Sequence, residues 1–138
     1  MPDRIPVLVT TEFSDDLLDS FRAVSDRIAL HYYPARTVDD VPDEVWAQAE
    51  VLYTSSVVPD PEDAPKLRWI QLHFAGVDHL VEQPIAQSDQ VIVTSASGIH
   101  ATTMAEYTFM MMLALGHHLL TVLRLQGMLG RPGTPLQR

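Results

Sequence analysis

The sequence predicts an α/β fold, a five-stranded parallel sheet with helices on both faces, plus one long C-terminal helix. The first observation behind it is an alternation, along residues 1–100, of short apolar, β-branched runs with helical stretches. Strands of this type are buried on both faces and join through right-handed helical crossovers. The second observation is that residues 101–127 contain no proline and read as a single helix.

Each element has its own signal. The run IPVLVT at 5–10 is the first expected strand, and Ser14 precedes a helix with two acids in its first turn. Pro42 fits the first turn of a second helix, at 41–49. The remaining expected strands are 27–33, 50–55, 67–72 and 91–94, and a short helix is expected at 78–83. Residues 1–100 therefore form the expected main domain.

The predicted C-terminal helix, 101–127, would span roughly 40 Å at 1.5 Å per residue. Its first half, MAEYTFMMMLAL, is apolar on nearly all sides, a pattern of helices that are buried on several faces or that await a partner. Glu106 at one end and His117 and His118 at the other leave too few apolar residues for a membrane span, so no membrane is expected. Residues 128–138 are rich in glycine and proline and are expected to be a linker.

Composition narrows the class of protein. The 138 residues suffice for one domain with an appendage, and the absence of cysteine excludes disulfides and thiolate metal sites. No export signal is expected, so a cytoplasmic location is predicted. The net charge is −9, and 14 of the 18 acids lie at or before Asp63. With one lysine and no basic cluster, the chain is not expected to bind nucleic acid.

Two loops could carry chemistry. The first, His73 to Asp78, leads from a strand into a helix through Gly76, and such a turn can present free backbone N–H groups to a carboxylate. The same turn also fits a purely structural role, with Asp78 as the helix cap. The second, residues 94–100 (TSASGIH), precedes the long helix in the same way. Ligands of open parallel sheets sit outside the carboxyl ends of the strands, where both loops are expected.

The segments LRWIQLHFAGVDHL and VIVTSASGIHATTMAEYTFMMMLAL resemble the catalytic, substrate-binding domain of the D-isomer-specific 2-hydroxyacid dehydrogenases, the formate and glycerate dehydrogenase family. The resemblance implies a flavodoxin-like fold and hydride transfer between a small 2-hydroxy or 2-oxo acid and NAD or NADP. It assigns the substrate carboxylate to backbone N–H groups of Ala75, Gly76 and Val77. It places the loop of Tyr53, Thr54 and Ser55 beside the same pocket, and Thr103 near the nicotinamide.

The sequence departs from that family in one large respect. The resemblance implies that the dinucleotide loop and the Arg, Glu and His that carry the chemistry come later in the chain, and no G-x-G-x-x-G is present. No catalytic residue is therefore assigned, no cofactor is expected to bind this chain alone, and the isolated chain is predicted to be inactive. We also expect a homo-oligomer formed through the helix 101–127, because losing a neighbouring domain would expose Phe109, Met112, Leu119 and Leu123.

Other classes fit less well. The six histidines form no i, i+4 pair, so no metal site is predicted. Ser97 lacks the first glycine of a hydrolase elbow. A response-regulator receiver would need an acidic pair after the first strand and an aspartate after the third, where the chain has Thr10-Thr11-Glu12 and 53–55 (YTS). The alternative that stays open is a free-standing ligand-binding or interaction module on the same fold.

Overall fold

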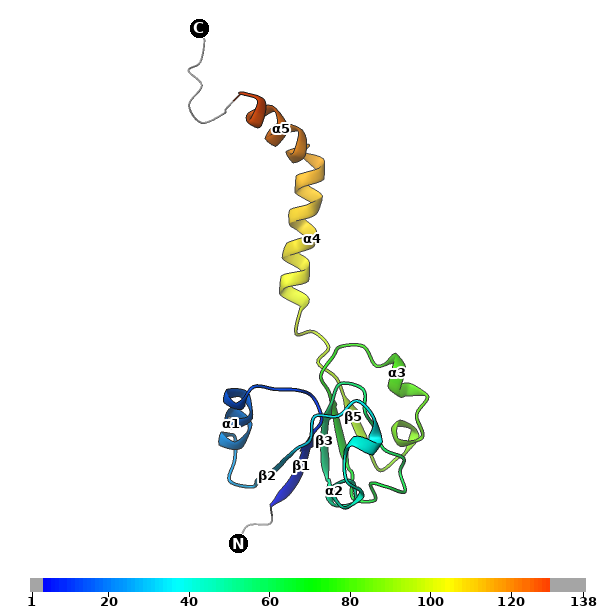
Figure 1. Ribbon diagram of the computed structural model, residues 1–138. Coiled ribbons are helices and arrows are strands. Elements are labelled where there is room, and N and C mark those ends of the chain that lie inside the picture. Colours follow the sequence, from blue (N-terminus) through cyan, green and yellow to red (C-terminus); the bar gives the residue numbers. More distant parts are fainter. Residues whose placement is uncertain (1–3, 130–138) are drawn as a thin grey trace. The chain divides into compact units, whose positions relative to one another are not determined.

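A computed structural model describes residues 4–129 (Figure 1). The chain divides into two compact units, Met1–Gly98 and Ile99–Arg138. The first unit holds five strands, β1 (Ile5–Val9), β2 (Ile28–Tyr32), β3 (Val51–Thr54), β4 (Trp69–Leu72) and β5 (Ile92–Thr94). All pair in parallel, in the order β2-β1-β3-β4-β5. The predicted α/β fold with a five-stranded parallel sheet of flavodoxin-like topology is confirmed.

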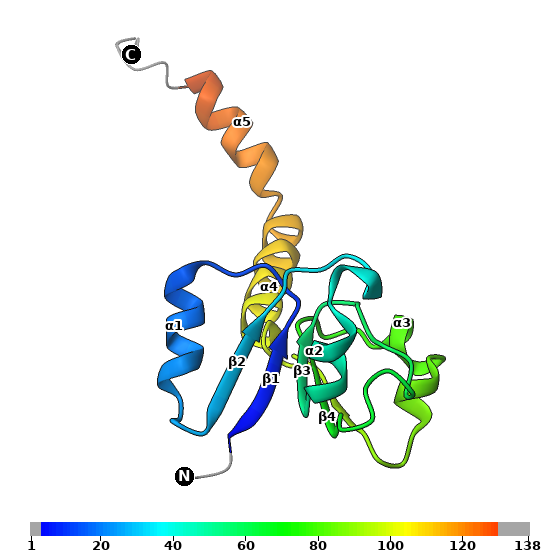
Figure 2. The same cartoon turned by 60° about the horizontal axis from the view of Figure 1, so that its bottom comes forward.

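One face of the sheet carries the hydrophobic core. Leu8, Leu52 and Ile70 lie side by side in neighbouring strands, and all three are almost fully buried. Helix α2 (Asp43–Gln48), helix α3 (Asp78–Val81) and the 3₁₀ turn Pro84–Gln87 cover this face (Figure 2). Trp46 of α2 is buried there, and its Nε1 donates to the carbonyl oxygen of Val38 over 3.2 Å.

The opposite face is covered differently. Helix α1 (Asp15–Ala23) lies on the β1 and β2 side and buries Leu18. Successive residues of a strand point to opposite faces, so the residues next to the core positions line this second face. Trp69 and Ile92 are two of them, and both are exposed. The sheet is therefore fully covered on one face and only partly covered on the other.

The C-terminal segment differs from the prediction in its continuity. Helical structure is present, but as two helices, α4 (Ala101–Gly116) and α5 (Leu119–Leu129), with a 64° bend between them. The break falls at His117 and His118, and His118 has φ of 51°. Gly116 has a low helix propensity, and the two following residues leave the helical region, so the last turn of α4 ends there. The expected single helix 101–127 was wrong in this respect.

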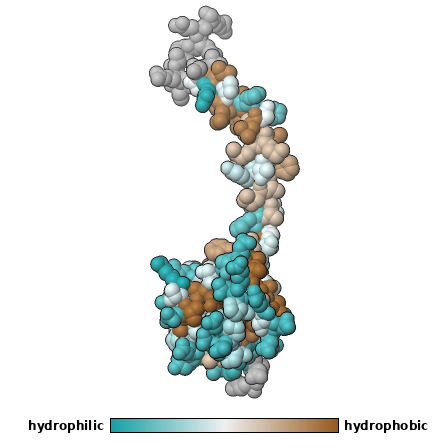
Figure 3. Space-filling view, turned by 90° about the vertical axis from the view of Figure 1, so that its right-hand side faces the viewer, coloured by the Kyte–Doolittle hydropathy of each residue, from teal (hydrophilic) through white to brown (hydrophobic). Residues whose placement is uncertain are grey.

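Large apolar side chains are exposed along α4 and along α5 as far as Leu125 (Figure 3). Neither helix among residues 4–129 is by itself long and apolar enough to cross a membrane, although α4 and α5 together satisfy that test by length and composition. The four residues predicted to be exposed, Phe109, Met112, Leu119 and Leu123, are all exposed. The predicted linker 128–138 lies almost wholly outside the described residues.

Candidate functional site

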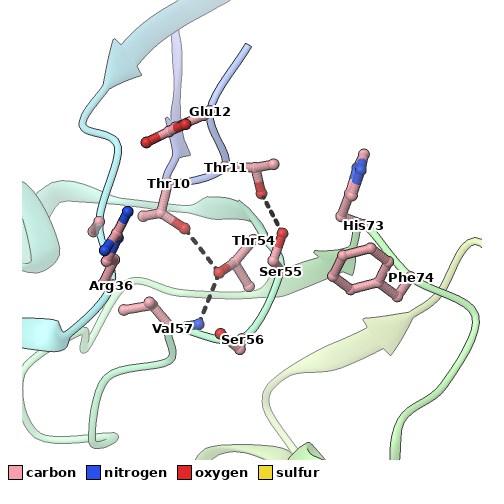
Figure 4. Close-up of a pocket in the computed structure, with 11 residues that line it drawn as sticks. Thr10, Thr11, Glu12, Arg36, Thr54, Ser55, Ser56, Val57, His73 and Phe74 are labelled. Carbon is pink, nitrogen blue, oxygen red and sulfur yellow. Dashed lines mark hydrogen bonds between the residues drawn. The ribbon is translucent and has the colours of Figure 1, made fainter.

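The carboxyl ends of the parallel strands surround a cavity of about 330 Å³ (Figure 4). Loops that follow β1, β2, β3 and β4 all contribute to its wall, as expected for an open parallel sheet. The lining residues are Thr10, Thr11, Glu12, Ala35, Arg36, Thr54, Ser55, Ser56, Val57, His73 and Phe74.

Hydroxyl groups fix the loops after β1 and β3 to each other. The hydroxyl of Thr10 donates to that of Thr54 over 2.8 Å, and both side chains are buried. Thr54 Oγ1 also accepts a hydrogen bond from the backbone N–H of Val57, at 3.0 Å. Nearer the surface, the hydroxyls of Thr11 and Ser55 are 3.1 Å apart and share a hydrogen bond. Two hydrogen bonds, one buried and one nearer the surface, thus join the loops after β1 and β3 and hold this part of the cavity wall in place.

The charged side chains of the cavity come from different loops. Figure 4 shows Arg36 and Glu12 on the wall formed by the loops after β2 and β1. Asp40 orders the Arg36 loop, because its Oδ2 accepts from the backbone N–H groups of Arg36 and Thr37 over 2.8 and 2.9 Å. These bonds, that of Arg36 first, hold the pKa of Asp40 below its ordinary value. The loop that carries the cavity's guanidinium is therefore anchored by a carboxylate that stays ionised.

An aromatic cluster forms the wall beside β4. The hydroxyl of Tyr53 and Nδ1 of His73 are 2.9 Å apart and share a hydrogen bond. Phe13 and Phe74 pack against His73, with ring centroids 5.6 and 5.0 Å away. Burial raises the pKa of Tyr53, so its phenol stays protonated and can donate to Nδ1 when the imidazole carries its proton on Nε2. In that tautomer Nε2 of His73 remains a hydrogen-bond donor.

The three backbone N–H groups of the predicted glycine turn, Ala75–Val77, are not used by the rest of the described chain. No described residue accepts a hydrogen bond from the backbone N–H of Ala75, Gly76 or Val77. The turn is exposed, and the carbonyl oxygen of Phe74, just before it, accepts from the N–H of Ala96 over 3.1 Å. This bond joins the two loops singled out from the sequence. The cap of α3 is Val77, not Asp78, so the cap role considered for Asp78 was wrong.

The structure brings only some of the predicted site residues together. Thr54 and Ser55 line the cavity. The side chain of Tyr53 points to the opposite face of the sheet and packs between Phe13 and Phe21. The Ala75–Val77 turn follows Phe74 directly but is outside the lining set. Thr103 is the third residue of α4, in the second unit.

Sequence reasoning missed several lining residues. Thr10, Thr11, Arg36 and His73 were assigned no binding role of their own. Of these, Thr10, Thr11 and His73 directly follow the carboxyl end of a strand. That position was the signal that could have identified them.

Residues 4–129 contain no group of three or more potential side-chain ligands placed to hold one metal ion.

Among known proteins, solved structures share the fold of this chain, whereas family models and curated sequences give no match. No protein-family model matches the chain, and no curated protein matches it either. Solved structures do match. One is D-lactate dehydrogenase from Aquifex aeolicus, complexed with NAD and lactic acid, with a TM-score of 0.61 and 19% identity over 96% of this chain. A second is phosphoglycerate dehydrogenase from Lactobacillus plantarum, with a TM-score of 0.52 and 23% identity over 85% of this chain.

The fold is shared with these dehydrogenases. A third match, the NAD⁺-bound 3-phosphoglycerate dehydrogenase of Entamoeba histolytica, has a TM-score of 0.56 and 17% identity over 80% of this chain. The chain spans 40%, 37% and 39% of the three solved chains. The likeness thus extends over most of this chain and over about two fifths of each solved structure.

Proposed function

We propose that the chain is the substrate-binding part of an NAD(P)-dependent D-2-hydroxyacid dehydrogenase. The observation that carries the proposal is the Ala75–Val77 turn, whose three N–H groups have no partner among the described residues. Neighbouring backbone N–H groups that lack a partner can bind a carboxylate, the group that every 2-hydroxy and 2-oxo acid presents. The fold shared with the solved dehydrogenases supports the same reading.

The residues of this chain would bind and orient the substrate. In the proposal the turn takes the carboxylate, and Thr103 lies near the nicotinamide in the complete enzyme. Ser55, tied to Thr11, and His73, tied to Tyr53, present polar atoms to the remainder of the molecule. Arg36 adds a positive charge to a front half that is otherwise strongly acidic. These groups fit a small polar acid.

The cofactor does not fit the residues present. The sequence has no G-x-G-x-x-G, and its last glycine cluster, residues 127–133, contains a proline. NAD or NADP would supply the hydride in the complete enzyme. Turnover also needs a cation at the carboxylate and an acid at the carbonyl oxygen, for which this chain provides no assigned residue. We therefore propose that the 138-residue chain alone is inactive, and NADH oxidation with any 2-oxo acid would contradict this.

A binding experiment tests the proposed site directly. Backbone amide NMR signals of Ala75, Gly76 and Val77 should shift on titration with D-glycerate or D-lactate, whereas acetate, which lacks the 2-hydroxyl, should shift them less. A matched variant is Gly76→Ala, because a Cβ there would meet no atom closer than 3.8 Å in the free protein. The variant should keep the fold. It should lose the ligand-induced shifts, because the added Cβ would stand where the carboxylate has to approach the backbone. Shifts that are identical in Gly76→Ala, or absent from the turn in the wild type, would contradict the proposal.

Two further properties belong to the proposal. The first is a homo-oligomer formed through residues 101–127, supported by the exposed apolar side chains of α4 and α5. Light scattering that shows a monomer at high concentration would contradict it. The second is a cytoplasmic location, supported by the cysteine-free sequence. Fractionation of cells that express the protein, with recovery outside the cytoplasmic fraction, would contradict that.

A further inference from the structure

The cavity at the carboxyl ends of the strands extends well beyond the turn that takes the substrate carboxylate. The sheet order β2-β1-β3-β4 places the loop of Arg36 at one end and Phe74, next to the Ala75–Val77 turn, at the other (Figure 4). The ends of β2 and β4 are three strand spacings apart, roughly 14 Å. A three-carbon acid bound at the turn by its carboxylate would therefore leave the β2 end of the cavity unfilled.

Arg36 gives the β2 end of the cavity a positive charge on an ordered loop. It is the one Lys or Arg among the lining residues. The loop is held to the end of β1 because the N–H of Ala35 donates to the carbonyl oxygen of Thr10 over 3.0 Å. Within residues 4–129, neither Asp40 nor Glu12 forms an ion pair with the guanidinium. The guanidinium can therefore bind an anion in the cavity.

The loop after β3 adds hydrogen-bond donors to the same cavity. No described residue accepts a hydrogen bond from the backbone N–H of Ser55 or Ser56, and both residues line the cavity. The side chain of Ser55 is held by its bond to Thr11, which orders this loop. A guanidinium combined with neighbouring backbone N–H groups is a donor set that binds carboxylate and phosphate oxygens.

Glu12 makes the β2 end of the cavity selective. Its side chain lines the same cavity as Arg36, and the two come from the loops after the neighbouring strands β1 and β2. A carboxylate repels an anion, so an anionic group binds here only if it contacts the guanidinium directly. Removing the charge of Glu12 should therefore strengthen the binding of a ligand that reaches Arg36 and leave a shorter ligand unaffected.

We propose that the substrate is a 2-hydroxy or 2-oxo acid with a second anionic group, a carboxylate or a phosphate, at the far end of its carbon chain. Arg36 and the N–H groups of Ser55 and Ser56, together called the distal anion subsite, bind this second group. The inference rests on the proposed dehydrogenase function, in which the first carboxylate lies at the Ala75–Val77 turn, and it names the substrate class. Arg36 is a specificity-determining residue in this proposal and takes part in no chemical step.

An NMR titration of the 138-residue chain measures both ends of the cavity at once. D-2-hydroxyglutarate and D-3-phosphoglycerate should shift the amide signals of Ser55 and Ser56 together with those of the Ala75–Val77 turn. D-lactate, which has one anionic group, should shift the turn alone and bind about tenfold more weakly. The comparison of the two longer acids shows whether the subsite prefers a carboxylate or a phosphate. Longer acids that bind no more tightly than D-lactate would overturn the proposal.

Arg36→Gln tests the guanidinium itself. The variant should bind D-2-hydroxyglutarate about tenfold more weakly and D-lactate within about twofold of the wild type. Arg27→Gln is the matched control, because it removes the same charge from an exposed position that does not line the cavity, and it should leave both affinities unchanged. Glu12→Gln should strengthen only the binding of D-2-hydroxyglutarate. Equal weakening by Arg36→Gln and Arg27→Gln would overturn the proposal, because net charge would then govern binding.

The remaining outcomes separate this inference from the proposed function. Acids that all shift the Ala75–Val77 turn and leave Ser55 and Ser56 unchanged keep the proposed function and overturn the distal anion subsite. Shifts at Ser55 and Ser56 without shifts at the turn keep the subsite and contradict the carboxylate site on which the proposed function depends. Equal losses of D-lactate and D-2-hydroxyglutarate binding in Arg36→Gln would overturn the inference, because Arg36 would then bind the carboxylate that both acids share.

Discussion

Replacing Thr54 by valine tests whether the cavity is held by its buried hydroxyls. Valine keeps the shape of threonine, so the change removes one oxygen and creates no cavity. Thr54 Oγ1 accepts from the hydroxyl of Thr10 at 2.8 Å and from the N–H of Val57 at 3.0 Å. Thr54 is fully buried and Thr10 nearly so, so water cannot replace the lost acceptor at either donor without a local rearrangement.

The size of the effect follows from those two donors. A buried donor left without a partner costs about 1–3 kcal/mol. The hydroxyl of Thr10 can rotate in search of another acceptor, whereas the N–H of Val57 is fixed, so we expect a total loss of about 2–4 kcal/mol in the free energy of unfolding. That is a large share of the roughly 5–15 kcal/mol that holds a domain together. Thr11→Val, which loses the part-buried bond to Ser55, should cost less than about 0.5 kcal/mol.

Urea unfolding, followed by the fluorescence of the buried Trp46, measures both variants. The double variant Thr10→Val with Thr54→Val removes donor and acceptor together, so it should be less destabilised than the sum of the two single variants by about 1 kcal/mol. A loss below about 0.5 kcal/mol for Thr54→Val would refute the reasoning. Equal losses in Thr54→Val and Thr11→Val would refute it as well, because burial would then have no influence on the cost.

Three further predictions concern loops around the sheet. Gly76→Ala should leave the melting temperature within about 2 °C of the wild type, since its Cβ meets no close atom, and a large drop would show that the turn needs glycine for its own geometry. Gly98→Ala should cost about 1 kcal/mol in urea unfolding, because φ of 90° at Gly98 strains any other residue, and an unchanged midpoint would contradict this. Asp40→Asn should lower the melting temperature at neutral pH. Hydrogen bonds from the backbone N–H groups of Arg36 and Thr37 hold the pKa of Asp40 below 3.8 in the folded protein. The stability that Asp40 contributes is therefore fully present above pH 3.8 and is lost as the pH falls through the lower pKa of the folded state. The difference in melting temperature between wild type and variant should shrink only below about pH 3.8.

The fold could be predicted because its signals are local. Each strand is a short apolar run, and the helices that separate most of the strands favour crossover connections and a parallel sheet. The break at His117 and His118 could not be predicted in the same way. Proline was the signal used for a helix end, and the chain leaves the helix there without one, next to Gly116.

The site could be predicted only in part because it is assembled across strands. Gly76 stands out in the sequence as a turn residue, and no described residue accepts a hydrogen bond from the N–H groups of residues 75–77. Arg36 has no such local mark. It reaches the cavity because Asp40 holds its loop and because β2 and β1 are parallel neighbours, and both facts depend on contacts that the sequence does not display.

Tyr53 and Thr54 show how strand periodicity decides between structural and binding roles. Adjacent strand residues point to opposite faces, so two residues of the same predicted loop cannot both face the cavity from within β3. Thr54 takes the cavity side and joins the loops after β1 and β3, while Tyr53 takes the other side and reaches the cavity only through its hydrogen bond to His73. A change at Tyr53 should therefore act on ligand binding through the orientation of His73, and the double variant of Tyr53→Phe with His73→Ala should bind no worse than His73→Ala alone. Additive losses in the NMR titration would instead mean that Tyr53 contacts the ligand itself.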